Sequence, residues 1–234
     1  MLISVHMPKT AGTSFTESLR GHFGARLTLA YGDRPLHRPA WQRNGNALGR
    51  ALRNAVAGPG QDSVDCIHGH FLPLAFRWVG ASASLRFVTW LRDPTDRLVS
   101  HYEHWRREAA PATDTLHQRM LDENWSFEAF AFRPELRNVY SLFLWGFPVD
   151  RFNFIGITEH YDADLEVFGR HLLGAHLSPA RVRQNPKRST DTYELDEDLR
   201  RRIERFHERD FALYRHALAL REQRAGEGLD AIRR

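Results

Sequence analysis

Short apolar runs alternate with stretches of helical periodicity along the chain. The run from Leu85 to Leu91 leaves little room for a solvent face, which is typical of a strand covered on both sides in a parallel sheet. Similar runs predict four more strands: residues 2–5, 26–31, 64–67 and 152–157. Apolar residues at helical spacing predict helical segments: residues 15–23, 98–105, 113–145, 162–173 and 196–220. This alternation predicts an α/β domain of three layers, with a central, mostly parallel sheet flanked by helices.

Two segments depart from the alternation. Residues 32–60 are rich in Gly, Pro, Arg and Asn, with Trp41 and Leu48 as sparse apolar anchors, and we expect a surface excursion that is partly helical at best. Residues 181–193 are expected to form a polar loop. The length of 234 residues suits one domain, so we assign residues 1–220 to a single domain and residues 221–234 to a polar C-terminal tail.

Composition excludes several classes of protein. Hydrophobic residues make up 42% of the chain, but no segment approaches the ~18 consecutive apolar residues that span a bilayer. No signal peptide is recognisable, and the single cysteine, Cys66, excludes an internal disulfide and a cysteine-based zinc site. We therefore expect a cytoplasmic protein. The net charge of +4 suits a small polyanionic ligand and is too small to indicate nucleic acid.

The first strand leads into a loop with the chemistry of an anion site. Pro8, Lys9, Thr10, Ala11, Gly12, Thr13 and Ser14 separate the strand from the helix that starts near Phe15. A helix N-terminus presents free N–H groups and the positive end of its dipole, and Lys9 adds a charge. The spacing differs from a Walker A loop, because Lys9 precedes Gly12 and no glycine lies four residues before it. We therefore expect a phosphate or sulfate site and disfavour a magnesium-nucleotide NTPase.

Three polar clusters follow predicted strands, at residues 7–14, 68–70 and 92–100. Ligands of open parallel sheets bind at the carboxyl ends of the strands, so these clusters are candidates for one shared site. In the third cluster, Arg92 stands at a strand end, where its guanidinium can grip a phosphate, and Ser100 lies two helical turns further on. A capped helix with solvated arginines is the alternative for this cluster.

Two of these motifs resemble sulfotransferases that use 3′-phosphoadenosine 5′-phosphosulfate. Residues 8–15 look like the 5′-phosphosulfate loop of that family, and residues 91–102 look like its 3′-phosphate motif. His68-Gly69-His70 and residues 154–159 resemble segments of the carbohydrate branch, which includes the uronyl and heparan 2-O-sulfotransferases and small bacterial relatives. The resemblance implies a P-loop-like fold and a nucleotide donor that leaves as adenosine 3′,5′-bisphosphate, with no metal required.

The resemblance also implies roles for individual residues. Residues 8–14, Arg92 and Ser100 would bind the nucleotide, and a looser match adds Lys187, Arg188 and Ser189 in a loop over it. Lys9 would stabilise charge on the leaving phosphate, and His70 would be the general base for the acceptor hydroxyl. We expect His68 to point to the opposite face of its strand and to serve a structural role.

The resemblance implies an acceptor that is a carbohydrate or glycoconjugate, but the sequence does not identify it, nor the oligomeric state. His6 and the helix residues 103–107 could line the acceptor cleft, although for the helix residues a solvated face is the favoured interpretation. Residues 32–60 and 106–150 match no known motif. Two other functions stay open: a nucleotide-dependent kinase of related fold, and a non-catalytic module that binds a nucleotide or a sulfated glycan and does not need His70.

Overall fold

A sheet of five parallel strands forms the centre of the protein. The computed structural model describes residues 1–58, 63–80, 84–111, 114–177, 179 and 195–232, with side chains as far as residue 226. The strands are β1 (Leu2–Val5), β2 (Leu27–Ala30), β3 (Cys66–Gly69), β4 (Arg86–Leu91) and β5 (Phe154–Ile157). Their order in the sheet is β2-β3-β1-β4-β5, and each neighbouring pair is parallel. The predicted α/β fold with its central parallel sheet is confirmed.

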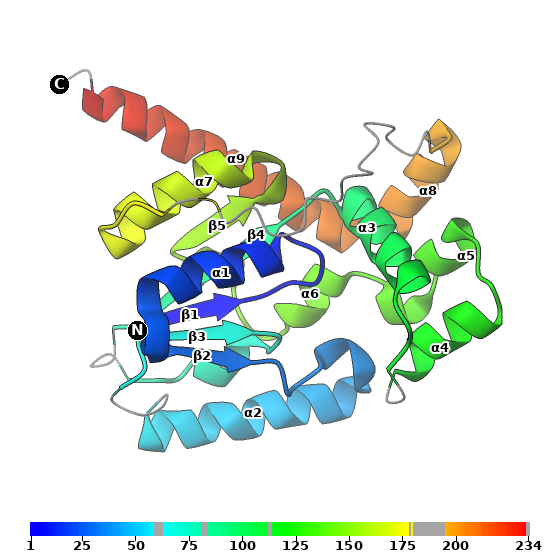
Figure 1. Ribbon diagram of the computed structural model, residues 1–234, viewed down its shortest axis with the longest axis horizontal. Helices are drawn as coiled ribbons and strands as arrows, with labels where there is room; N and C mark the ends of the chain where they lie inside the picture. Colours follow the sequence, from blue (N-terminus) through cyan, green and yellow to red (C-terminus); the bar gives the residue numbers. More distant parts are fainter. Residues whose placement is uncertain (59–62, 81–83, 112–113, 178, 180–194, 233–234) are drawn as a thin grey trace.

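Helices cover both faces of this sheet (Figure 1). On one face lie α1 (Gly12–Phe23), α7 (Tyr161–Phe168) and the π-helical turn that follows it (Gly169–Leu173). Apolar side chains of the strands and these helices form one core: Leu2, Phe15, Leu19, Val88, Trp90, Phe154, Leu165 and Phe168. Because adjacent strand residues point to opposite faces, Ile3 and Phe87 belong to the core on the other side.

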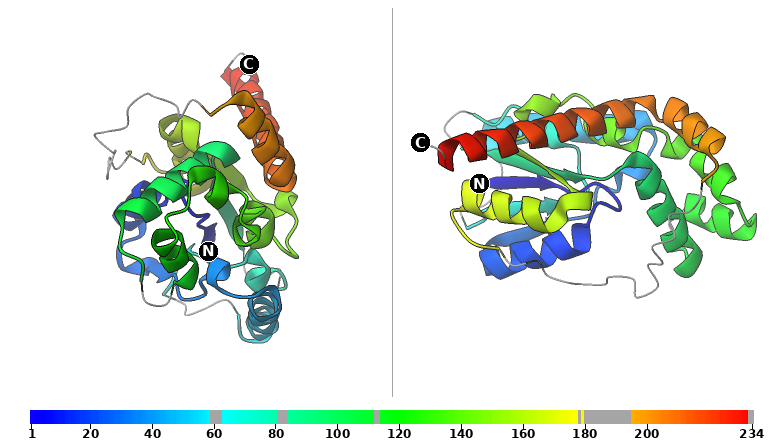
Figure 2. Two further views of the ribbon diagram at one scale, coloured as in Figure 1. Left: turned by 90° about the vertical axis from the view of Figure 1, so that its right-hand side faces the viewer. Right: turned by 90° about the horizontal axis from the view of Figure 1, so that it is seen from above.

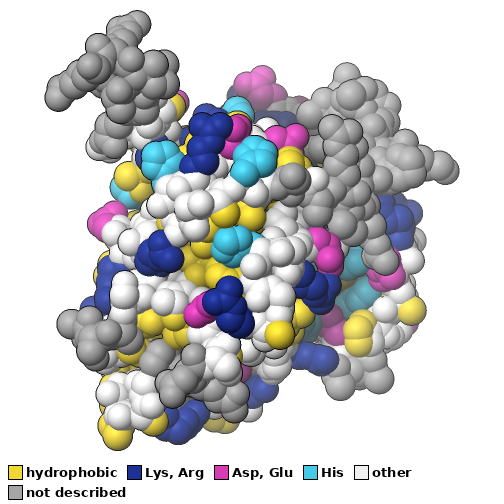
Figure 3. All heavy atoms as spheres, turned by 60° about the vertical axis from the view of Figure 1, so that its left-hand side comes forward, with side chains coloured by type: hydrophobic (Ala, Val, Ile, Leu, Met, Phe, Trp, Pro, Cys, Tyr) yellow, Lys and Arg dark blue, Asp and Glu magenta, His cyan; other side chains and the backbone are white. Residues whose placement is uncertain are grey.

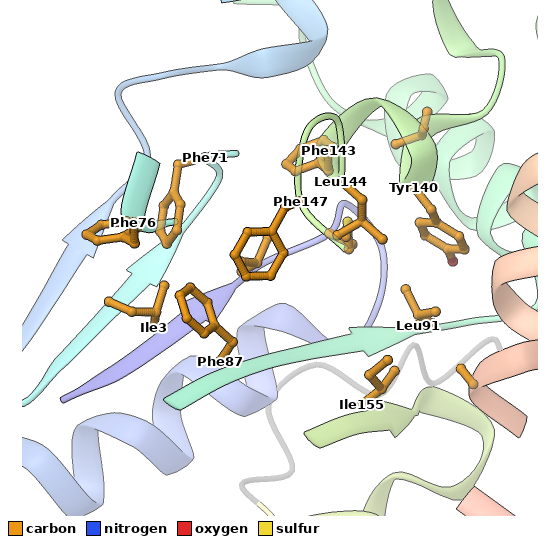
Figure 4. Packing of buried hydrophobic residues seen from close by; sticks show 14 of the residues in the cluster. Ile3, Phe71, Phe76, Phe87, Leu91, Tyr140, Phe143, Leu144, Phe147 and Ile155 are labelled. Atoms are coloured by element: carbon orange, nitrogen blue, oxygen red, sulfur yellow. The ribbon is translucent and has the colours of Figure 1, made fainter. Parts of the chain in front are cut away.

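The second face packs against a different set of elements. These are the 3₁₀ turn η3 (Pro73–Phe76), α6 (Val139–Phe143) and the long α9 (Glu208–Ile232). Figure 4 shows the aromatic side chains that fill this core, where the rings of Phe87 and Phe147 lie 4.7 Å apart. Further out, α2 (Ala40–Ala57) packs on η3 through Ala47 and Ala51, which are buried.

A helical lobe lies beyond the carboxyl ends of the strands. It contains α3 (Pro94–Arg107), α4 (Thr115–Asp122), α5 (Phe127–Ala131) and α8 (Glu197–Phe206) around a third apolar core. Figure 2 shows α9 running from this lobe across the length of the molecule. Shorter 3₁₀ turns complete the described chain: η1 (Gly24–Arg26), η2 (Pro35–His37), η4 (Pro134–Leu136), η5 (Val149–Arg151) and η6 (Thr158–His160).

Two expectations about the helices are wrong. Residues 32–60 are not a weakly structured excursion, because α2 occupies 18 of them, and Trp41 is no anchor, because its side chain is 78% exposed. The single helix expected over residues 196–220 is broken at His207. That imidazole is fully buried, with Nε2 2.8 Å from the carbonyl oxygen of Ala131, and α8 ends beside it.

The C-terminal region continues α9 instead of leaving the domain surface at residue 220. Arg221 donates to the Asp164 carboxylate at 2.8 Å, and Arg224 donates to the carbonyl oxygen of Ile155 at the same distance. The domain boundary at residue 220 stays a prediction. In the part of the chain that the structure describes, no helix is long and apolar enough to cross a membrane.

Candidate functional site

The three polar clusters follow three neighbouring strands. Residues 7–14, 68–70 and 92–100 come directly after β1, β3 and β4, which lie in the order β3-β1-β4 in the middle of the sheet. Since the strands are parallel, their carboxyl ends meet at one edge, on the side of the helical lobe (Figure 1). Lys187, Arg188 and Ser189 lie outside the described residues.

The loop between β1 and α1 has an unusual backbone. Lys9 and Ala11 both have left-handed conformations, with φ of 67° and 59°. Such conformations are uncommon for residues other than glycine, cost of the order of 1–3 kcal/mol each and occur most often at functional sites. Thr10 Oγ1 donates to the carbonyl oxygen of Met7 at 2.8 Å and closes the loop on itself. Left-handed residues of this kind turn successive N–H groups toward one point, which makes an anion-binding concavity.

The N-terminus of α1 is left without a capping side chain. Ala11 occupies the cap position, and the first turn contains no acidic residue. The N-terminus of α3 differs, because the Asp93 carboxylate accepts from the N–H groups of Thr95 and Asp96. The free N–H groups of α1 are therefore available to an external anion, whereas those of α3 are already engaged.

Lys9 is surrounded by other cations. Burial, together with the charges of Arg107 and Arg92, lowers its pKa to about 8, while Glu108 opposes them. Among the described residues, neither Lys9 nor Arg107 forms a salt bridge. Arg92 comes from the end of β4 and Arg107 from the last turn of α3, so three separate elements bring positive charge to one place. We call Lys9, Arg92 and Arg107 the cationic cluster.

Ser100 lies on the helix face that looks toward this cluster. Burial lowers the pKa of His104, and the charges of Lys9 and Arg107 lower it as well; Arg107 also contributes to the lowered pKa of Lys9. Ser100 stands four residues before His104 and seven before Arg107, so the three share one face of α3. The structure thus brings the loop at Lys9 and the motif at Arg92 and Ser100 to the same site. Among helix residues 103–107, the favoured solvated face holds for Arg106 and Arg107, which are exposed, and does not hold for Trp105, which is buried.

Tyr140 was not singled out from the sequence, yet it fixes the main chain of Arg92. Its hydroxyl donates to the carbonyl oxygen of Arg92 at 2.7 Å and accepts from the Arg92 N–H at 3.1 Å. The N–H groups of Tyr140 and Ser141 both donate to the buried Asp210 carboxylate of α9. Tyr140 lies 48 positions from Arg92 in the chain, so the sequence gave no signal of this contact, although the burial of Tyr140 in the core was foreseeable.

Beside the cationic cluster, imidazole rings gather around His6. The ring of His6 stacks on His68 with centroids 5.2 Å apart and meets His70 edge-on at 4.5 Å. Both histidines therefore face the same way, and the expectation of opposite faces is wrong. The physical reason is the strand period of two, which places residues 68 and 70 on one side. We call His6, His68 and His70 the imidazole cluster.

The hydrogen bonds of His68 fix its tautomer. Thr16 Oγ1 donates to the carbonyl oxygen of Gly12, so its oxygen accepts from His68 Nε2 at 3.0 Å. His68 Nδ1 is then unprotonated and accepts from Ser4 Oγ at 2.7 Å. Both ring nitrogens are engaged and the residue is 1% exposed. This geometry leaves His68 a structural part of the cluster.

His70 and His6 are linked through their rings. His70 Nε2 lies 3.2 Å from His6 Nδ1, which is also 3.0 Å from the hydroxyl of Tyr31. His6 also explains Gly12, because a Cβ atom there would lie 1.6 Å from His6 Nε2. Tyr31 was missed in the sequence, although it directly follows β2 at the same edge of the sheet.

All three imidazoles are unprotonated at neutral pH. Burial lowers the pKa of His70 to about 4, with a contribution from the charge of His37, and lowers that of His68 to about 3. Burial, with smaller contributions from His70, His68 and Lys9, holds the pKa of His6 well below its usual value. A neutral imidazole is the form that a general base needs, although a low pKa reduces the driving force for taking a proton.

A cavity of about 730 Å³ is lined in part by His37, whose charge contributes to the lowered pKa of His70. Its walls come from residues 36–43, from 115–145 and from α9, so they include the two segments that match no motif. Basic side chains dominate the lining: His37, Arg38, Arg43, Arg119, Arg137 and Arg209. Glu135 is the acidic residue among the lining side chains, and Trp145, which is 40% exposed, adds an aromatic surface.

Comparison with protein-family models and with curated proteins finds no match for this chain. Among solved structures, the crystal structure of a sulfotransferase from Alicyclobacillus acidocaldarius is similar, with a TM-score of 0.45 and 17% sequence identity over 94% of each chain. A similarity of this size carries no argument about activity, so the function is argued below from the site itself. Among the described residues, no group of three or more His, Cys, Asp or Glu side chains could hold a metal ion.

Proposed function

We propose that this protein is a sulfotransferase that moves a sulfuryl group from 3′-phosphoadenosine 5′-phosphosulfate to a hydroxyl of a carbohydrate or glycoconjugate. The observation that carries the proposal is the cationic cluster. Two anion-binding elements, one after β1 and one after β4, are close enough for the charge of Arg92 to lower the pKa of Lys9. A nucleotide with phosphate groups at both its 5′ and 3′ positions would engage both elements at once.

The residues of the cluster suit such a donor. The uncapped N-terminus of α1 and Lys9 would take the 5′-phosphosulfate, while Arg92 and Ser100 would take the 3′-phosphate. When bound, the nucleotide supplies the sulfuryl group and leaves as adenosine 3′,5′-bisphosphate. Lys9 and the free N–H groups would stabilise the charge that develops on the leaving phosphate, which is where such groups contribute most to rate.

His70 is the proposed general base. Its ring nitrogen lies 3.2 Å from that of His6, and it is unprotonated at neutral pH. It would take the proton of the acceptor hydroxyl as the oxygen attacks sulfur. The six basic side chains around the cavity favour an acceptor that carries carboxylate or sulfate groups, and Trp145 offers a surface on which a sugar ring can stack.

The two alternatives differ from this proposal in what they require. A kinase needs a carboxylate after a strand to hold magnesium, and Asp93, which follows β4, is occupied as the cap of α3. A non-catalytic module needs the cationic cluster alone, and the low pKa of His70 is the observation that favours it. Turnover separates this module from a transferase.

The test is transfer from ³⁵S-labelled donor to a panel of neutral, carboxylated and sulfated glycans, together with thermal unfolding in adenosine 3′,5′-bisphosphate. We expect label on the anionic glycans and a rise in melting temperature, since a ligand of the native state stabilises it. Arg209→Ala should raise the acceptor KM without changing nucleotide affinity, whereas Arg26→Ala, at the opposite edge of the sheet, should change neither. Stabilisation without any transfer would favour the binding module.

A further inference from the structure

One face of α2 is apolar and exposed. The side chains of Trp41, Leu48, Leu52 and Val56 are 78%, 37%, 62% and 91% exposed. Their spacing of seven, four and four residues puts them on a single stripe about 22 Å long, at 1.5 Å per residue. We call these four residues the α2 stripe.

The stripe takes no part in holding α2 on the domain. The helix packs through a different face, where the buried Ala47 and Ala51 contact the loop and turn that contain Leu72 and Leu74. Asn54 on that face donates to the carbonyl oxygen of Ala75 at 2.8 Å. The apolar surface of the stripe is therefore not a by-product of core packing, and large exposed apolar surface of this kind marks an interaction site.

The charged residues of the segment that carries the stripe are all basic. Residues 34–57 contain five arginines and no Asp or Glu, in a chain whose total formal charge is only +4. Arg50 pairs with Asp33 at 2.5 Å, just outside this segment, and Arg53 lies three residues before Val56 on the flank of the stripe. On the face drawn in Figure 3, by contrast, Lys and Arg side chains are dispersed, and several lie beside acidic ones.

This combination selects among the partners that could cover the stripe. A second copy of the chain would bring two acid-free, arginine-bearing helices together, and their charges would repel. A bilayer with anionic headgroups matches both features, because the apolar stripe enters the acyl boundary while arginines stay at the headgroups. Tryptophan at one end of the stripe is also typical of the interface.

We propose that α2 is an interfacial helix that docks this protein on an anionic lipid bilayer, with the α2 stripe inserted and Arg53, on the flank of the stripe, contacting headgroups. The same segment contributes Arg38, Pro39 and Arg43 to the wall of the cavity. Docking through α2 would therefore hold that cavity next to the headgroups. The inference does not depend on the proposed enzymatic activity.

The test is co-sedimentation with two kinds of vesicle, one of phosphatidylcholine alone and one that also contains about 30 mol% phosphatidylserine. The buffer contains about 0.1 M salt. We expect binding to the anionic vesicles only, weakened at about 0.5 M salt. Leu52→Gln with Val56→Gln should abolish it, and Arg53→Gln should weaken it about fivefold. Arg170→Gln, at an exposed arginine in the π-helical turn that follows α7, is the matched control and should bind as the parent does.

Circular dichroism and the melting temperature check that each variant is folded. Tryptophan emission should shift to shorter wavelength on binding, and Trp41→Phe should remove that shift. Absence of binding to anionic vesicles, or binding that Leu52→Gln with Val56→Gln leaves intact, would overturn the proposal. A concentration-dependent dimer in sedimentation velocity that the same double variant abolishes would assign the stripe to a second copy and overturn it as well.

Discussion

Two polar clusters lie side by side at the carboxyl edge of the sheet, and they differ in how they hold charge. The cationic cluster gathers Lys9, Arg92 and Arg107 without a salt bridge to Lys9 or Arg107 among the described residues. The imidazole cluster keeps three histidines unprotonated by burying them. Arg92 lies 4.0 Å from the Asp96 carboxylate, so the cluster is only partly neutralised. Such an excess of positive charge suits anion binding, whereas a buried neutral base suits proton transfer. In the proposed group-transfer reaction, the cationic cluster would bind the nucleotide and the imidazole cluster would remove the proton.

The largest expected effect comes from the base. His70→Ala should lower kcat by about 10²- to 10⁴-fold, because it removes the group proposed to take the acceptor proton. The dissociation constant for adenosine 3′,5′-bisphosphate should stay within about twofold, since His70 is outside the cationic cluster. Steady-state kinetics and calorimetry measure the two quantities, with the exposed His171→Ala as control. An unchanged kcat would remove His70 from this role.

The acid limb of the rate profile sharpens the same assignment. A base must be unprotonated, so kcat/KM should fall only as pH drops through about 4, the pKa of His70 in the free protein, and not near 6.5. A profile of kcat/KM between pH 4 and 8 tests this, with fluorescence as a check on folding at each pH. A half-maximal value near pH 6.5 would show that another group acts as base.

A smaller effect separates the two ends of the cationic cluster. Arg92→Ala removes charge-assisted contacts to the proposed 3′-phosphate and should weaken adenosine 3′,5′-bisphosphate by about 10- to 100-fold. Adenosine 5′-phosphate should lose less than about threefold, because it lacks the group that Arg92 would hold. Calorimetry with both ligands measures the difference, and Arg26→Ala is the matched arginine control. Equal losses for the two nucleotides would contradict the assignment.

At alkaline pH, the change in nucleotide affinity should come from Lys9. In the free protein its pKa is about 8, so above that pH the lysine loses its proton and its charge. A bound anion favours the charged form, so nucleotide affinity should begin to fall as pH rises through about 8, the pKa of Lys9 in the free protein. It should then fall by up to about tenfold per pH unit. Calorimetry in buffers of different ionisation enthalpy should show proton uptake at pH 8.5. Lys9→Arg, which stays charged, should lose this pH dependence.

The smallest effect tests the support of the imidazole cluster. Tyr31→Phe removes the hydroxyl 3.0 Å from His6 Nδ1 and should lower kcat by about three- to tenfold, the equivalent of one hydrogen bond, without changing nucleotide affinity. Tyr102→Phe, which removes a hydroxyl that donates to Trp125 in the helical lobe, is the matched control and should leave kcat unchanged. A kcat that Tyr31→Phe leaves unchanged would show that His6 does not need this contact.

By itself, the amino-acid sequence determined the strands, their parallel sheet and the three polar clusters that follow strands β1, β3 and β4. Continuous apolar runs and the loop from Pro8 to Ser14 are local signals, so they survive without knowledge of the fold. The sparse apolar residues of 32–60 revealed neither the helix α2 nor the face through which it packs. Trp41 looked like an anchor and is exposed, because the small side chains of Ala47 and Ala51 let the other face of α2 approach the turn η3.

Only the tertiary structure decided which side chains meet. Tyr31 is 25 positions from His6, His70 is 64 positions from it, and Tyr140 is 48 positions from Arg92. The tautomer of His68 and the pKa values of Lys9 and His70 depend on these distant neighbours and on burial. Burial and through-space charge are properties of the packed molecule, and no local pattern in the sequence encodes them.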